Sequence, residues 1–158
     1  MATYSVYDIK VDNSIQIPLT STLLSVDSTG KVVGTATPTP NGSFGISIDG
    51  GGSVITTGVK GWAVIPYSGT ITGWDIISDI SGSCVIDVWK TNYASAPPTV
   101  SNTIAGSEKP TLSSATKNQD NALTTWTTSV TAGDIVAFNV DSASTLTRVS
   151  LSIKITKS

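Results

Sequence analysis

The chain has 158 residues, the length of a single domain, with 13% charged residues and a formal net charge of −2. This weak potential, with no run of Lys or Arg, argues against binding of nucleic acid through phosphate contacts. The absence of histidine and the presence of one cysteine exclude histidine acid–base chemistry, an intrachain disulfide and a cysteine-based zinc site. We therefore expect no cofactor and no catalytic or structural metal.

The opening residues, MATYSVYDIK, do not predict a secretory leader, because no basic stretch precedes an apolar one. No apolar run approaches the roughly 20 residues of a membrane-spanning helix. We therefore expect no membrane insertion.

Residues 1–35 read as an N-terminal β-arm made of short strand-like pieces, YSVYDIKV, SIQIPLT and STLLSV. A turn is expected at Asp27–Gly30, because Asp, Ser and Gly favour turns. Residues 36–43 alternate Pro and Thr before Asn-Gly and read as an extended linker. The arm is expected to contact other subunits or a capsid through Tyr4, Tyr7, Ile15 and Ile17.

Residues 44–158 read as the main domain, with strand-favouring runs separated by turn signals. In the last run, TRVSLSIKIT, apolar and polar residues alternate, which predicts an antiparallel strand with one buried face. The helical signal of Leu112–Leu123 is weak, and we expect a loop or one short turn there. The expected fold is all-β, an antiparallel sandwich of jelly-roll type. The expected strands are FGISI, GWAVIPY, TITGWDIIS, SCVIDVWKT, ALTTWTTSV, DIVAFNV and TRVSLSIKIT.

The glycine-rich stretch DGGGS at residues 49–53 is expected to be a turn or a loop that contacts another chain. A phosphate-binding loop needs two glycines separated by four residues, then Lys and Ser or Thr opening a helix, and this spacing is missing. The possible subunit or capsid contacts here are Asp49, Gly50, Gly51 and Gly52.

Nothing in the sequence predicts an enzyme. Glu108 is the only glutamate, no pair of carboxylates is fixed in one cleft, and serine has no histidine to activate it. Calcium bound by scattered loop carboxylates leaves little trace in a sequence and stays open. The aromatic residues Trp62, Tyr67, Trp74, Trp89, Tyr93 and Trp126 either fill a core or subunit interface or form a platform for stacking sugars.

The stretch SCVIDVWKTNY at residues 83–93 reads as a core strand with apolar residues on both faces. Cys84 is expected to be a small buried hydrophobe. Asp87 lies among apolar residues and needs a partner if it is buried. We expect a structural ion pair between Asp87 and Arg148, with Lys90 as the other possible partner.

From about Ile46 onward, several ordered blocks carry a resemblance: ISIDGGGSVITTGVKGWAVIPYSGTITGW, SGSCVIDVWKTNYASAPPTV, GSEKPTLSSATKNQDNALTTWTTSVTAGDIVAFNVDS and TRVSLSIKI. They resemble a β-sandwich domain that recurs in virion proteins of tailed bacteriophages, often at the carboxyl end of tail or fibre proteins. The resemblance covers about two thirds of the chain and leaves out residues 1–35. It implies a non-enzymatic, commonly trimeric module on the particle exterior.

Two functions follow from this resemblance as hypotheses. The first is a trimeric capsid decoration (cement) protein that contacts itself and the major capsid protein or other virion proteins. The second is a receptor-binding module of a tail or fibre that recognises a host-surface glycan. Under either, the protein is made in the host cytoplasm and resides on the outside of the virion.

Overall fold

The computed structural model describes residues 22–26, 28–36 and 40–158. The chain divides into two units, Met1–Pro38 and Thr39–Ser158. The candidate contact residues Tyr4, Tyr7, Ile15 and Ile17 lie outside the described residues.

The first unit contains a β-hairpin of strands β1 (Thr22–Val26) and β2 (Val32–Ala36). The strands are antiparallel, with Val26 opposite Val32 and Thr22 opposite Ala36. A turn occupies Ser28 and Thr29, and Gly30 has a φ of 81°. Glycine adopts this left-handed conformation without a steric penalty, which is why the turn forms here as the sequence predicts.

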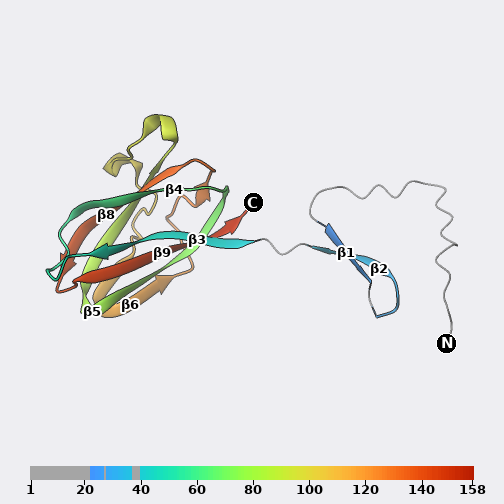
Figure 1. The fold of residues 1–158 in the computed structure, drawn as a ribbon, viewed down its shortest axis with the longest axis horizontal. Coiled ribbons are helices and arrows are strands. Elements are labelled where there is room, and N and C mark those ends of the chain that lie inside the picture. Colours follow the sequence, from blue (N-terminus) through green and yellow to red (C-terminus); the bar gives the residue numbers. More distant parts are fainter. Residues whose placement is uncertain (1–21, 27, 37–39) are drawn as a thin grey trace. The chain divides into compact units, whose positions relative to one another are not determined.

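The second unit is one antiparallel sheet of seven strands (Figure 1). The described residues contain no α-helix, only two short 3₁₀ turns, η2 (Tyr93–Ser95) and η3 (Val100–Asn102), in the loop after β5. The prediction of an all-β antiparallel fold is confirmed. The strands are β3 (Asn41–Asp49), β4 (Gly58–Val64), β5 (Gly69–Thr91), β6 (Thr111–Asp120), β7 (Ser129–Val130), β8 (Ile135–Ser144) and β9 (Arg148–Lys157).

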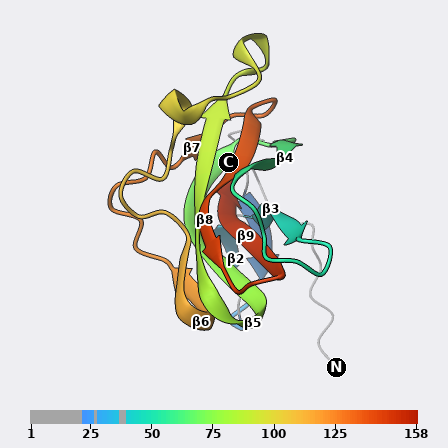
Figure 2. The same ribbon diagram turned by 90° about the vertical axis from the view of Figure 1, so that its left-hand side faces the viewer.

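Strand β5 is 23 residues long and joins the two halves of the sheet. Residues 69–78 of β5 pair with β9, and residues 83–91 pair with β8, which gives the order β3-β9-β5-β8-β4. β6 and β7 pair with the opposite edge of β5. Figures 1 and 2 show β5 running along the unit, with the loop that follows it projecting beyond one end.

Side chains from both halves of this sheet share one hydrophobic core. Ile76 of β5 and Ile153 of β9 come from the first half, and Val88 of β5 and Phe138 of β8 come from the second. The finer prediction of a two-sheet jelly-roll sandwich is not confirmed, because hydrogen bonds through β5 join all seven strands in one sheet.

The C-terminal strand β9 shows most clearly how the sequence builds this core. Val149, Leu151, Ile153 and Ile155 are all buried, as their alternation with polar residues predicts. β9 pairs with β3 on one side and with β5 on the other, so it is a central strand.

Three expectations differ from the structure. Residues 111–120 form strand β6, although Leu112–Leu123 was expected to be a loop or a short turn. The run ALTTWTTSV at residues 122–130 forms a strand only at Ser129–Val130. β3 begins at Asn41, inside the stretch 36–43 that reads as a linker, because Asn41 pairs with Thr156 of β9.

Candidate functional site

Asp87 is a buried carboxylate on the outer face of β5, held by three contacts. Its Oδ1 accepts hydrogen bonds from Thr103 Oγ1 (2.6 Å) and from the amide of Val88 (2.8 Å). Its Oδ2 lies 2.9 Å from Lys109 Nζ, which also contacts Asp141 Oδ2 at 2.8 Å. Hydrogen bonds to Asp141 and, to a smaller extent, to Asp87 raise the pKa of the Lys109 amine. The loop between β5 and β6 thus supplies the charge that Asp87 requires.

The expected ion pair between Asp87 and Arg148 is wrong. Arg148 Nε lies 2.8 Å from Asp49 Oδ2, because the register of β3 and β9 places these two residues opposite each other. The Arg148 guanidinium lowers the pKa of Asp49. Lys90, the other partner considered, pairs with Asp134 at 3.0 Å.

The glycine-rich stretch forms the exposed turn after β3. Gly51 and Gly52 have φ values of 65° and 84°, which glycine adopts readily. The Gly51 amide donates to Asp49 Oδ1, and the Gly50 amide donates to the carbonyl of Thr147. Asp49, Gly50, Gly51 and Gly52 therefore lie together at one end of the sheet, and their role as subunit contacts stays a prediction.

Cys84 is buried in β5, as the sequence predicts. Burial raises the pKa of its thiol to about 11. Since the thiolate is the reactive form of cysteine, this side chain is a packing residue in the described fold.

Glu108 ties the loop before β6 to the irregular segment 121–128. Its carboxylate accepts hydrogen bonds from the hydroxyls of Thr124 and Thr125 and from the amide of Thr125. These hydrogen bonds lower the pKa of Glu108 to about 2, and the one from the Thr124 hydroxyl has the largest effect. The Trp126 indole donates to the backbone carbonyl of Glu108 at 3.0 Å, and this second contact with Glu108 holds the buried ring although the segment forms no strand.

The aromatic residues divide between the core and the surface. Trp74, Trp89 and Trp126 are buried, whereas Trp62 is 61% exposed and Tyr93 is 79% exposed. Tyr67 is half-buried beneath Lys157 Nζ, which lies 4.4 Å from the ring centroid. Three tryptophans thus fill the core, whereas Trp62 and Tyr93 lie outside it, and their role in an interface or a sugar site stays a prediction.

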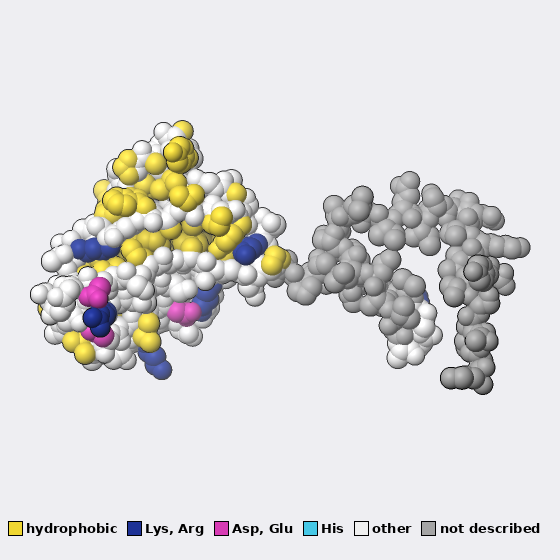
Figure 3. Space-filling view, viewed as in Figure 1, with side chains coloured by type: hydrophobic (Ala, Val, Ile, Leu, Met, Phe, Trp, Pro, Cys, Tyr) yellow, Lys and Arg dark blue, Asp and Glu magenta, His cyan; other side chains and the backbone are white. Residues whose placement is uncertain are grey.

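Trp62 belongs to an exposed apolar surface on the outer side of β4 and β8. The register aligns Trp62 with Ala137 and Trp89 in one row across the sheet, and Val64 with Ile135 and Thr91 in the next. Val64 is 62% exposed. In Figure 3, hydrophobic side chains gather over this part of the sheet and over the projecting loop.

A hollow of about 430 Å³ lies within this surface. Its lining is almost entirely apolar and comes from β4, from the start of β8 and from the loop after β5. We call the following set of residues the β4 face: Trp62, Val64, Tyr93, Ala96, Pro97 and Ile135.

The β4 face could not be recognised in the sequence, because GWAVIPY reads as an ordinary buried strand. The alternation places Trp62 and Val64 on the same side of the strand, but it does not show whether that side faces the core or the solvent. The usable signal was that both sides of this run are apolar, which leaves one of them without a core to enter.

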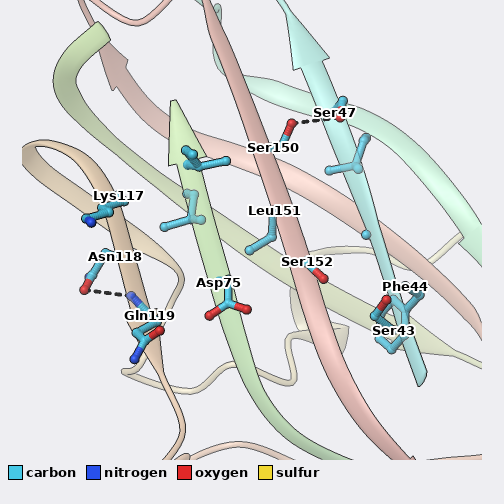
Figure 4. Close-up of a pocket in the computed structure, with 14 residues that line it drawn as sticks. Ser43, Phe44, Ser47, Asp75, Lys117, Asn118, Gln119, Ser150, Leu151 and Ser152 are labelled. Atoms are coloured by element: carbon cyan, nitrogen blue, oxygen red, sulfur yellow. Dashed lines mark hydrogen bonds between the residues drawn. The ribbon is translucent and has the colours of Figure 1, made fainter. Parts of the chain in front are cut away.

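A second concave surface lies on the outer side of β3, β9, β5 and β6 (Figure 4). It is an open groove of about 1090 Å³. Its floor carries small side chains, such as Ser47 and Ser150, whose hydroxyls are 2.8 Å apart. Asp75 and Lys117 also line it, and Asp75 Oδ1 is paired with Lys154 Nζ at 2.8 Å. The polar groups thus contact one another and point to no particular ligand.

The described residues hold no group of three or more His, Cys, Asp or Glu side chains placed to bind a metal ion. Within the same part of the chain, no helix has the length and apolar character needed to span a membrane.

Comparison with known proteins gives little further information. No protein-family model and no curated protein matches the chain. A solved structure of the infectious bursal disease virus Gx strain is similar at 14% identity, with a TM-score of 0.23. The match covers 86% of this chain and 41% of that chain, so this chain spans less than half of its length. A TM-score this low carries no argument about function.

Proposed function

We propose that this chain is a structural protein of a bacteriophage particle, a homotrimeric decoration (cement) protein on the capsid exterior. The observation that carries the proposal is the β4 face, where Trp62, Val64 and Tyr93 are each more than 60% exposed on one side of the sheet. Monomeric proteins seldom leave large apolar side chains grouped in this way, and such a group marks a contact with another protein.

The resemblance of residues from about Ile46 onward to domains of phage virion proteins is the reason for assigning the chain to a phage particle. The low charge and the many hydroxyl side chains of the chain support an exterior position. Only 13% of residues are charged, and hydroxyl side chains such as Ser47 and Ser150 cover the opposite half of the sheet. In this proposal the sheet unit faces solvent, and residues 1–35 contact the major capsid protein or other virion proteins.

The exposed rings of Trp62 and Tyr93 favour a second candidate, a tail or fibre module that binds a host-surface glycan. Sugar rings stack on exposed aromatic side chains, and both rings line the hollow of the β4 face. In this alternative the β4 face binds the glycan and remains uncovered in the particle.

Cryo-electron microscopy of the phage particle separates the two functions. A decoration protein would be present in many copies on the head, in fixed ratio to the major capsid protein. A receptor-binding module would be present in few copies at the tail and would bind host glycans on an array. Absence of the chain from the purified particle would contradict both.

A further inference from the structure

We propose that the β4 face is the surface on which a second copy of this chain docks, with the free edge of β4 contacting the neighbouring copy. This inference deepens the homotrimer part of the proposed function, since it names the contact surface. It rests on the edge of β4, on the apolar hollow beside it and on the lack of charge there.

β4 ends the sheet and has an open edge. It pairs with β8 on one side, and none of the other described strands pairs with its second side. An edge strand exposes unpaired amide and carbonyl groups, which form hydrogen bonds readily with another chain. Soluble proteins usually protect such an edge with a charged side chain, a proline or a bulge.

The protection of β4 covers only its beginning. The bulge lies between Val59 and Gly61. Lys60, the one charged residue of the strand, donates to Thr56 Oγ1 and to the Thr57 carbonyl, so its amine is directed back along its own chain. Residues 61–64, GWAV, carry no charge, no proline and no bulge. The open edge and the exposed Trp62 and Val64 therefore coincide.

The charge distribution favours a second copy as the partner. None of the residues of the β4 face is charged. The charges next along this side of the sheet, on Asp87 and Asp141, are neutralised in part by Lys109. Two copies can therefore bring such faces together without like-charge repulsion, and a strongly charged partner would gain nothing. In a homotrimer, three copies of this face would meet around the three-fold axis.

The proposal is tested with the full-length chain carrying Val64→Lys. Val64 is exposed in the single chain, so the lysine leaves the fold intact but introduces a charge into the proposed contact. Ile77→Lys is the matched control, because Ile77 is 58% exposed on β5 at the groove of the other half of the sheet. Circular dichroism and thermal unfolding verify that both variants are folded.

Sedimentation velocity over a range of micromolar concentrations measures self-association. We expect the unaltered chain and Ile77→Lys to have similar association constants. The association constant of Val64→Lys should be lower, on the order of a hundredfold, as for a central interface residue. The proposal would be overturned if the unaltered chain stayed monomeric, or if the two lysine substitutions weakened self-association equally.

Tryptophan fluorescence gives an independent measurement, because Trp62 is the one exposed tryptophan of four. Acrylamide should quench it weakly in the oligomer and strongly after dilution or in Val64→Lys. Trp62→Phe should abolish this concentration dependence. Strong quenching of Trp62 within the oligomer would place the contact elsewhere and overturn the proposal.

These experiments use purified protein and are independent of the phage particle. Self-association through β4 in a chain that is absent from the particle would contradict the proposed function and leave the contact established. A monomer whose Trp62 is protected only by a host glycan or by another virion protein would instead identify a different occupant of the β4 face.

Discussion

Asp87 shows how one side chain connects the core of the sheet to the loop that covers it. A buried carboxylate is costly unless it has a partner and hydrogen bonds. Thr103 and Lys109 supply these contacts from the loop after β5, and the Thr103 backbone forms an isolated bridge with Trp89. The position of this loop and the burial of the Asp87 carboxylate therefore depend on each other.

Lys109→Met should destabilise the fold by about 2–3 kcal/mol, below the usual cost of breaking a buried ion pair, because water reaches part of the Lys109 site. Urea unfolding measures the loss. Adding Asp87→Asn should recover much of it, since no charge then remains buried. Arg148→Met, which removes the exposed pair with Asp49, is the control and should unfold close to the unaltered chain. Equal effects of the two methionine variants would refute the assignment of Asp87.

Cys84 should react with thiol reagents only slowly in the folded protein. With its pKa raised to about 11, the thiolate fraction at pH 8 is on the order of a hundredfold below that of an ordinary cysteine. Alkylation followed by mass spectrometry, with and without denaturant, measures this difference. Rapid alkylation of the native chain would show that Cys84 is accessible.

Gly82 marks the place where β5 changes partner from β9 to β8. A Cβ atom at this position would collide with Thr145 Oγ1 and would lie 2.6 Å from the Ser144 carbonyl oxygen. β5 can therefore come this close to the end of β8 only without a side chain there.

Gly82→Ala should cost about 1–3 kcal/mol, the range for overpacking, because backbone atoms have to move. Equilibrium unfolding gives the value. Gly133→Ala is the comparison. A Cβ atom there would meet nothing within 4 Å, so with a φ of 93° this variant measures the cost of backbone strain without steric overlap. Unchanged stability of Gly82→Ala would indicate that β5 and β8 are less closely apposed than described.

Glu108 should make the attachment of segment 121–128 sensitive to acid. Its pKa in the folded chain is lowered to about 2 from an ordinary value of 4.5. The carboxylate therefore stabilises the fold above about pH 4.5, and this contribution disappears as the pH falls from 4.5 towards 2. Unfolding of Glu108→Gln and of the unaltered chain should differ at pH 6 and converge near pH 2. A difference that persists at pH 2 would exclude the Glu108 charge as its cause.

Strands with a regular alternation could be predicted from sequence. β9 has one polar and one apolar side, and its four alternating aliphatic residues are buried. β6 was missed because most of its residues are exposed, including Lys117 and Gln119, so it lacks the apolar period that identifies a strand. The segment around Trp126 was expected to be a strand because it is rich in Thr and Trp, but the contacts with Glu108 hold it in a loop.

The contacts of the charged residues could not be predicted, because they depend on register and loop geometry. Asp49 and Arg148 are 99 residues apart and meet only because β3 pairs with β9 in one particular register. Lys109 reaches Asp87 because the loop after β5 returns over the sheet. The exposure of Trp62 likewise depends on β4 being the last strand of the sheet, which no local pattern reveals.

At the scale of the whole molecule, each described part relies on strand pairing and apolar burial rather than on crosslinks. A single buried cysteine allows no disulfide within the chain. We therefore expect the thermal midpoint of unfolding to be unchanged by a reducing agent and by a chelator. Differential scanning calorimetry in matched buffers measures it, and a chelator-dependent decrease would reveal bound calcium.

The double pairing of β9 also affects how the chain acquires its fold during synthesis. β3 is made early, yet its partner β9 is residues 148–157, so the ribosome has to add about a hundred residues before β3 can pair. β5 likewise waits for β8 and β9. Pairing between such distant segments makes folding slow. Until β9 emerges, the nascent chain would display unpaired apolar strands, and we expect it to depend on chaperones more than a protein of local hairpins does.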